Sequence, residues 1–243
     1  MTATYLRFEL LRTVRNGRFF VFSLGFPLIL YFAIAGPNAG ESDFEGLGVS
    51  VPLYYMIGLA SFGAMMSALS CGARIAAERS AGWNRQLRIT PLRPSVYLGA
   101  KVATAYALAL MSIVLLYASG FVLGVRLPAG DWLAMTLLIL VGLVPFAALG
   151  IVIGHLMTVD AIGPVMGGVT SLLALLGGTW FPITSGFMFE LARCLPSYWL
   201  VQASRVGVGG EGWGARGWLA IGAWSVALTA LAAWAYRRDT ARV

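Results

Sequence analysis

The sequence predicts an all-α membrane protein with six transmembrane helices, and three observations lead there. Of its 243 residues, 59% are hydrophobic and only 11% are charged, and the mean hydropathy is +0.80. Such a chain has too little polar surface for a soluble globule. Six long apolar runs divide it, and the basic residues behind the net charge of +7 stand beside those runs instead of forming one continuous face. They indicate membrane topology, not nucleic-acid binding.

The first predicted element, 1–18, is an interfacial helix. Its four arginines share one broad arc at helical spacing and its apolar residues fall on the other side: Arg7, Arg12, Arg15 and Arg18 against Leu6, Leu10 and Val14. This arrangement places the arginines near lipid phosphates.

The apolar run 19–36 follows. Ala33-Ile34-Ala35 resembles a small-residue cleavage site, so a signal peptide is the alternative to a retained membrane helix. The basic region before the run is long and itself patterned, which favours the retained helix.

Five further runs hold roughly 20 or more mostly apolar residues, enough at about 1.5 Å per residue to cross a hydrocarbon core of about 30 Å. They are 51–77, 95–125, 132–157, 161–182 and 217–236. Lys101 is the only charge in the second of these five runs, near its start, where a lysine can extend its amine to the membrane surface.

The segment 183–211 is too interrupted for a span, because prolines, charges and a glycine-rich end divide it. We expect an external re-entrant helical hairpin that dips into the outer leaflet, where protein or water must cover its broken backbone. Gly177, Gly178, Pro182 and Pro196 mark its approach and its turns.

The distribution of basic residues tests this topology. With both termini cytoplasmic, 13 of the 17 Lys and Arg residues lie inside, and the outer side holds Arg126, Arg193, Arg205 and Arg216. The loop 36–50 carries acidic residues and no Lys or Arg. This bias supports six spans with both ends inside.

Several chemistries are excluded. No GxxxxGK[ST], HExxH or GxSxG motif occurs. His155 has no partner at metal-ligand spacing, so we expect it to pack or hydrogen-bond at the cytoplasmic end, with a proton relay as the alternative.

Cys71 and Cys194 lack CxxC spacing, and we expect both to be packing residues. The middle stretches of the spans carry no charge, which disfavours proton-driven transport and indicates an energy source outside the chain.

A polar island, 78–94, lies between the second and third spans. A short amphipathic helix there would hold Trp83 and Leu87 among Arg79, Arg85 and Arg88, and Pro91 would stop it. Such a helix suits a partner's groove. An ordinary positive-inside loop is the alternative, and Glu78 would then only neutralise part of the arginine cluster.

The island resembles the cytoplasmic segment of type-2 ABC exporter permeases of the drug-resistance type, which reads approximately E-R-x-x-G, a few helical residues, L, then T-P-L. The matching residues are Glu78, Arg79, Gly82, Leu87, Thr90, Pro91 and Leu92. Gly177-Gly178-Thr179-Trp180-Phe181-Pro182 and then Leu195-Pro196 resemble that family's external hairpin, although Met188 to Cys194 departs from it.

The resemblance implies a transport subunit that couples to a separate ABC ATP-binding subunit. Its coupling residues would be Glu78, Arg79, Gly82, Trp83, Arg85, Leu87, Arg88, Pro91 and Leu92. ATP and Mg would bind in that partner chain, and this chain would hold no catalytic residue, metal or cofactor. A second permease subunit, either an identical copy or a close paralogue, would complete the path among membrane lipids.

The expected cargo is a hydrophobic or amphipathic small molecule, antibiotic-like, drug-like or lipid-like, moved outward across a bacterial plasma membrane. Export of a glycan or ion remains an alternative, as does a non-transporting scaffold that recruits a soluble protein. The candidate wall residues of the path are Phe62, Met65, Met66, Trp180 and Phe181, which as lipid-facing or core side chains would have a simpler explanation.

Two glycine pairs, Gly150 with Gly154 and Gly163 with Gly167, would let helix backbones approach closely. Packing within the chain and a seam between two chains are both compatible with these pairs.

Overall fold

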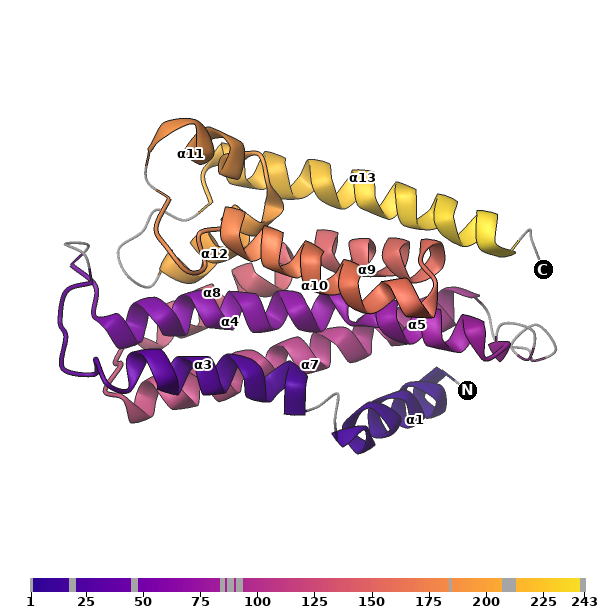
Figure 1. Cartoon of the computed structure of the whole chain (residues 1–243), viewed down its shortest axis with the longest axis horizontal. Coiled ribbons are helices and arrows are strands. Elements are labelled where there is room, and N and C mark those ends of the chain that lie inside the picture. The colour runs from indigo at the N-terminus through magenta and orange to yellow at the C-terminus, as the bar shows by residue number, and fades with distance from the viewer. Residues whose placement is uncertain are drawn as a thin grey trace.

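The computed structural model describes residues 2–17, 21–44, 48–83, 86, 90, 94–183, 185–206 and 213–240, and within these ranges it contains helices and their connections but no strand. Figure 1 shows the elements in chain order. They are α1 (Thr2–Arg15), the π-helical turn η1 (Val21–Gly25), α3 (Phe26–Ala35), α4 (Val51–Leu69), α5 (Cys71–Ser80), α7 (Pro94–Val122), α8 (Ala129–Gly142), α9 (Val144–Leu156), α10 (Val159–Leu176), α11 (Gly186–Arg193), α12 (Pro196–Arg205) and α13 (Ala215–Thr240).

Five helical segments are long and apolar enough to cross a membrane: Val51–Ser80, Pro94–Val122, Ala129–Leu156, Val159–Leu176 and Ala215–Asp239. Two of them are interrupted, one at Ser70 between α4 and α5 and the other at Leu143 between α8 and α9. The predicted first span, 19–36, contains a shorter apolar helix, Ser23–Ala35. The described residues therefore hold five full-length candidate spans and a sixth, shorter apolar helix.

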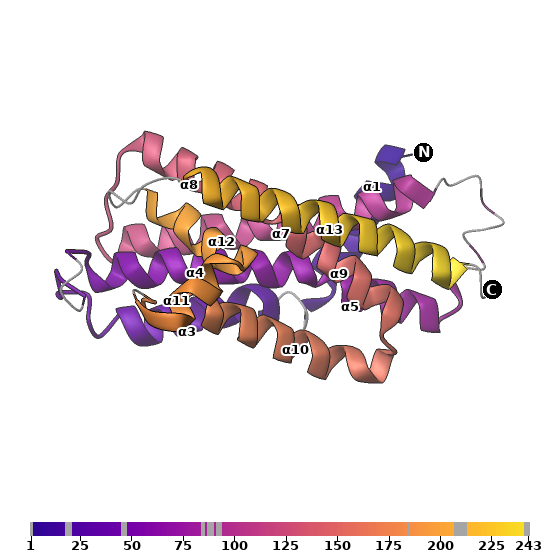
Figure 2. The same ribbon diagram turned by 90° about the horizontal axis from the view of Figure 1, so that it is seen from above.

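The helices form a bundle around α4 (Figures 1 and 2). The most apolar window of the α4 and α5 segment is 89% buried, against 17% for α10 and 22% for α13. Apolar side chains of α4, α7 and α9 make the core, including Leu59, Ile113 and Phe146. Helix α4 is therefore buried in the centre of the bundle, whereas α10 and α13 expose most of their surface.

The polar regions separate to opposite ends of the bundle (Figures 1 and 2). Helix α1, the end of α5 and the end of α13 lie at one end. The turn after α3 lies at the other end with α11 and α12. This separation suits a chain whose two polar ends face opposite sides of a membrane.

Helices α5 and α9 approach each other closely, and glycines make this approach possible. A Cβ atom on Gly154 would lie 2.7 Å from the Gly72 carbonyl oxygen, and one on Gly150 would lie 2.8 Å from the Leu69 carbonyl oxygen. The first glycine pair therefore packs within the chain. A Cβ on Gly163 or Gly167 would meet no atom within 4 Å, so the second pair is free of packing inside this chain.

The segment predicted as a hairpin contains two short helices, α11 and α12, with Cys194 and Leu195 between them. Gly178 has φ of +73°, a turn conformation that favours glycine. A Cβ on Gly177 would lie 3.0 Å from the Ser197 carbonyl oxygen, so the end of α10 meets the start of α12 there. Pro182 lies in the connection, and Pro196 opens α12, where its missing N–H costs nothing.

The two cysteines differ in their surroundings. Cys71 is buried against α9, as expected, and its thiol donates to the Ala147 carbonyl at 3.6 Å. Cys194 is exposed, so the prediction that it is a packing residue was wrong. It ends α11 on the outer surface of the helical pair, where its thiol donates only to the Glu190 carbonyl of its own helix.

The close approach of α5 and α9 predicts a selective effect of Gly72→Ala. The new methyl would run into the Gly150 backbone, and such overpacking costs roughly 1 to 3 kcal/mol. Gly222→Ala is the matched control, because it lies on α13 with no atom within 4 Å and alanine favours helix. Thermal unfolding of the detergent-purified protein should show a lower midpoint for Gly72→Ala alone. Equal midpoints would show that this contact is not tight.

Candidate functional site

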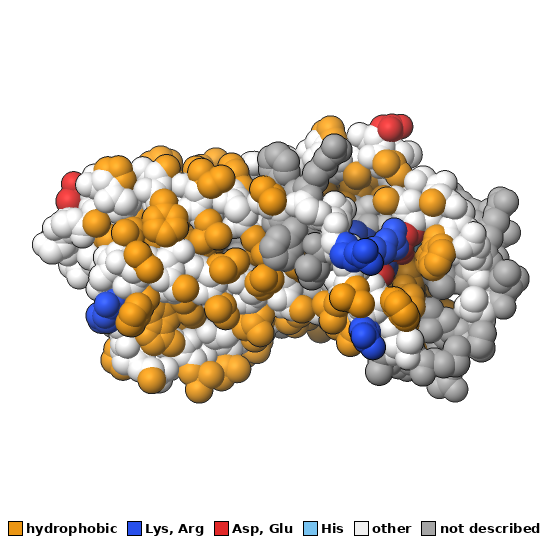
Figure 3. All heavy atoms as spheres, turned by 90° about the horizontal axis from the view of Figure 1, so that it is seen from below, with side chains coloured by type: hydrophobic (Ala, Val, Ile, Leu, Met, Phe, Trp, Pro, Cys, Tyr) orange, Lys and Arg blue, Asp and Glu red, His pale blue; other side chains and the backbone are white. Residues whose placement is uncertain are grey.

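Helix α1 faces the bundle with polar side chains. Glu9 and Thr13 are its buried residues, whereas Phe8 is 65% and Leu11 is 45% exposed. Figure 3 looks onto this side and shows hydrophobic side chains over much of the face, with basic and acidic groups gathered at the end where α1 lies. An interfacial helix can expose apolar residues to lipid, and the most deeply buried described side chains of α1 are polar.

Lys101 is the centre of these contacts. Its Nζ lies 2.6 Å from Glu9 Oε1 of α1 and 2.5 Å from Glu78 Oε1 of α5, and its side chain is fully buried. The prediction that this lysine extends to the membrane surface was therefore wrong. One carboxylate of α1 and one of α5 hold the amine, because a buried ammonium group must be paired.

Glu78 is more than a neighbour that neutralises nearby arginines. Besides Lys101, it accepts from Arg12 Nη1 at 2.8 Å and from the Tyr97 hydroxyl at 2.7 Å, and it is 3% exposed. Thr13 joins the same contact, since its Oγ1 accepts from Arg74 Nη1 at 2.9 Å. The group of Glu9, Arg12, Glu78, Tyr97 and Lys101, hereafter the α1 cluster, joins α1, α5 and α7.

Arg79, the next residue, bonds in another direction. Its Nη2 lies 2.8 Å from Asp239 Oδ1 near the end of α13, and its Nη1 donates to the carbonyl oxygens of Gly154 and Met157 at 2.9 and 3.2 Å. His155 Nδ1 lies 3.0 Å from the other Asp239 oxygen. His155 is therefore a hydrogen-bonding residue, as expected, in a network that joins α5 to α9 and α13.

The start of the polar island follows directly. Gly82 has φ of +72°, which turns the chain out of α5. Trp83 is 37% exposed and its side chain shares a hydrogen bond with Tyr5 of α1. Burial raises the pKa of the Tyr5 hydroxyl, with further raising by Glu9 and Glu78. The predicted coupling residues Arg85, Leu87, Arg88, Pro91 and Leu92 lie outside the described residues.

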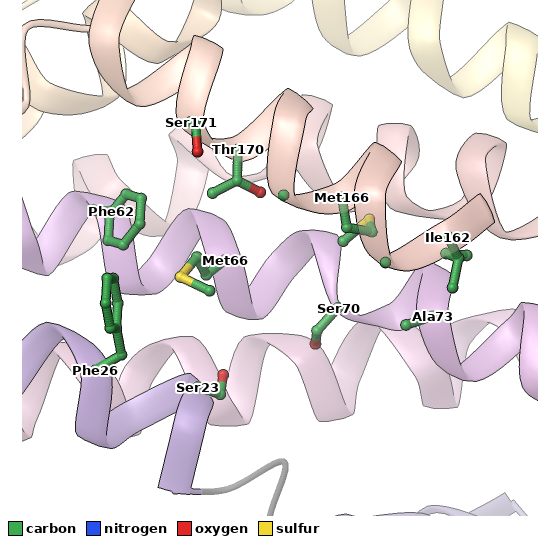
Figure 4. Close-up of a pocket in the computed structure, with 12 residues that line it drawn as sticks. Ser23, Phe26, Phe62, Met66, Ser70, Ala73, Ile162, Met166, Thr170 and Ser171 are labelled. Carbon is green, nitrogen blue, oxygen red and sulfur yellow. The ribbon is translucent and has the colours of Figure 1, made fainter. Parts of the chain in front are cut away.

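A cavity of about 350 Å³ lies between α3, α4, α5 and α10 (Figure 4). Two predicted wall residues, Phe62 and Met66, line it, together with Phe26 and Met166. Small and polar residues also line it: Ser23 of η1, Ser70 between α4 and α5, and Gly163, Gly167, Thr170 and Ser171 of α10. The cavity is mostly apolar, with a few hydroxyl groups from different walls.

The other predicted wall residues lie outside this cavity. Met65 is 2% exposed and packs in the core. The Trp180 ring packs against Phe62 in a tilted contact, with centroids 5.4 Å apart and the ring planes at 58°. Phe181 is 66% exposed near the far end of the bundle. The structure therefore brings Phe62, Met66 and Trp180 together and leaves Met65 and Phe181 apart.

Sequence reasoning missed Glu9, Tyr97 and Asp239 as members of these networks. A usable signal existed for the first two. Glu9 and Thr13, four residues apart, make a polar stripe on α1. Tyr97 and Lys101 share the same spacing on α7. Asp239 carried no comparable signal, because only the packing of α13 along α9 brings it to Arg79.

The described apolar helices and the separated polar ends define a multi-pass membrane protein. Among its described residues no group of three or more His, Cys, Asp or Glu side chains could hold a metal ion.

Comparison with known proteins identifies the class more closely. Residues 41–234 match the family described as ABC-2 family transporter protein. YvfS of Bacillus subtilis (strain 168), named as a transport permease, is 30% identical over 195 residues, which cover 78% of each chain. The chain therefore belongs to the ABC-2 transporter family, which confirms the resemblance seen in the sequence. It is a transmembrane transport subunit of an ABC transporter, and its family implies association with an ABC ATP-binding subunit.

The Arg79 network predicts the effect of Asp239→Asn. The amide would keep the shape but lose the charge that Arg79 and His155 share, so the last turn of α13 should open more often. Hydrogen exchange of the peptide covering 232–240 should speed up by about tenfold, equivalent to roughly 1.4 kcal/mol of local stability. Arg238→Gln is the control, since the Arg238 guanidinium lies over the Trp234 ring of its own helix, 5.3 Å from the ring centroid. Unchanged exchange in Asp239→Asn would show that the network does not hold α13.

Proposed function

We propose that this chain is the membrane half of an ATP-driven exporter, which moves a hydrophobic or amphipathic small molecule outward across a bacterial plasma membrane. ATP and Mg bind and react in a separate ATP-binding subunit, and this chain contributes no ATPase site. The observation that carries the proposal is the pair Glu78 and Arg79 at the base of the polar island. Their side chains bond to helices on both sides of α5.

The polar island is the element on which the ATP-binding subunit acts. Its first residues, Glu78 and Arg79, form the last turn of α5, and Gly82 then turns the chain out of the helix. A displacement of the island therefore acts on α5, whose side chains bond to α1, α7, α9 and α13. The chain supplies the transmission and the partner supplies the energy.

The cavity supports the class of substrate. Its aromatic and methionine side chains suit an apolar body, and Thr170 and Ser171 can hydrogen-bond a polar substituent. Such a lining favours an antibiotic-like, drug-like or lipid-like molecule over a glycan or an ion, which would need more polar partners.

A second permease subunit completes the path. Helix α10 lines the cavity with Gly163 and Gly167, and most of its remaining surface is exposed. We propose that α10 faces the second subunit, so that two cavities meet along one path.

The topology predicts where cysteines are accessible. In a Cys194→Ser background, a cysteine at Ser42 should react with a membrane-impermeant thiol reagent in intact cells, whereas one at Ser80 should react only after the membrane is opened. Both positions are exposed in the structure, so burial does not confound the comparison. In the otherwise unchanged chain, Cys194 should react from outside, as the external hairpin requires. Strong reaction at Ser80 in intact cells would overturn this orientation.

If the ATP-binding subunit acts on the polar island, Trp83→Ala should impair the complex. A buried aromatic at an interface contributes a few kcal/mol, whereas an exposed ion pair contributes about 0 to 1 kcal/mol. Trp83→Ala and Leu87→Ala should therefore reduce substrate-stimulated ATP hydrolysis and transport together by at least about tenfold, and Arg93→Ala should have a smaller effect. The assay uses the permease co-purified with its ATP-binding subunit.

The same assay separates the alternatives. Normal binding and transport in Trp83→Ala would show that the island is not the coupling element. If no ATP-binding subunit associates with the unmodified chain, the exporter proposal fails and a membrane scaffold that recruits another soluble protein becomes the better account.

A further inference from the structure

We propose that Lys101 is a positioning residue that ties α1 to the end of α5, so that α1 moves with the polar island. The chain has one lysine, and its amine is buried between carboxylates from two different helices. The inference deepens the proposed function and rests on it, because it adds α1 to the parts that the ATP-binding subunit moves.

The contacts of α1 carry this inference. Its buried residues, Glu9 and Thr13, both hold polar contacts, and its large apolar residues Phe8 and Leu11 point away from the bundle. The most deeply buried described contacts of α1 are therefore polar, while Leu6 and Leu10 are only half-buried. The ion pairs of Glu9 with Lys101 and of Arg12 with Glu78 join α1 to α7 and α5, beside the hydrogen bond from Arg74 to Thr13.

The energetics indicate a role in position more than in stability. A buried ion pair must offset the cost of removing two charges from water, and an apolar replacement of similar shape is often equally stable. An apolar contact, however, can slide, whereas the amine of Lys101 must stay within hydrogen-bond distance of Glu9 and Glu78. The α1 cluster therefore fixes the position of α1 relative to α5.

The geometry then divides a movement of the island into two parts. Glu78 transmits it to α1 and α7, and Arg79 transmits it to α9 and α13. Helix α1 precedes α3 in the chain, and α3 lines the cavity with Phe26. The contact of Lys101 with Glu9 therefore connects α3 to the island by a second route besides the packing of α3 on α4.

The first test needs no partner subunit. Because Lys101 supplies the only side-chain amine, an amine-reactive reagent followed by peptide mapping reports this site alone, with the N-terminal amine as internal reference. In the detergent-purified permease Lys101 should react at least about a hundredfold more slowly than the N-terminal amine, and Glu9→Gln should speed its reaction by about tenfold. Equal reaction of Lys101 and the N-terminal amine in the unmodified chain would overturn the buried tie.

The second test separates a tie from simple charge balance. Lys101→Met alone leaves two buried carboxylates facing each other and is expected to lower the yield of folded protein. Glu9→Gln with Lys101→Met removes one charge of each sign, so this double variant should fold. It should still bind the ATP-binding subunit, because neither substitution lies in the polar island. Substrate transported per ATP hydrolysed should fall by about tenfold, while ATP hydrolysis stays within about twofold.

The matched control is Glu190→Gln with Arg193→Met, which removes an exposed pair of 3.3 Å on α11, at the opposite end of the bundle. This variant should transport as much substrate per ATP hydrolysed as the unmodified complex does. If the Glu9 and Lys101 double variant also keeps that ratio, the α1 cluster balances charge only and the inference is wrong. Failure of the unmodified chain to bind any ATP-binding subunit would instead overturn the proposed function, and the amine-labelling result would stand by itself.

Discussion

The need to pair every buried charge at the end of the bundle constrains the rest of this structure. Lys101 lies where neither water nor lipid phosphates can reach its amine, and an isolated ammonium group there would be costly. Glu9 and Glu78 satisfy it, which brings α1 beneath α5 and turns the polar side of α1 inward. The exposed apolar side of α1 then suits contact with lipid. One buried amine thus determines the position of α1 and the environment of Glu78.

The same end of the molecule connects to the cavity through a single interrupted helix. Phe62 and Met66 of α4 and Ser70 at the interruption line the cavity, and Glu78 and Arg79 lie at the end of α5. The glycine contacts between α5 and α9 hold the two helices closely along this stretch. A movement applied at the polar island therefore has a short path, within one helical segment and its tightly packed neighbour, to the residues around the cavity.

Composition and apolar runs were sufficient to predict the class of fold, because a membrane imposes length and hydropathy directly on the sequence. The second predicted span ended at 77, and the helix continues through Glu78 and Arg79 to Ser80. The partners of these two residues could not be read from the chain, since Glu9, Lys101 and Asp239 reach them through packing between distant segments. Lys101 shows the difference most clearly. Near a span end a lysine usually extends to the surface, and only the nearby carboxylates of α1 and α5 keep it inside.

The central claim is that the polar island contacts the ATP-binding subunit, and photo-crosslinking from Gln86 tests it most directly. Gln86 is exposed and lies within the island, so a photoreactive amino acid there leaves the α1 cluster and the Arg79 network in place. In cells that express both subunits, irradiation should join this position to the ATP-binding subunit, whereas the same amino acid at Glu190 on α11 should not. Crosslinks from Gln86 only to lipid, or to proteins without an ATP-binding site, would contradict the account.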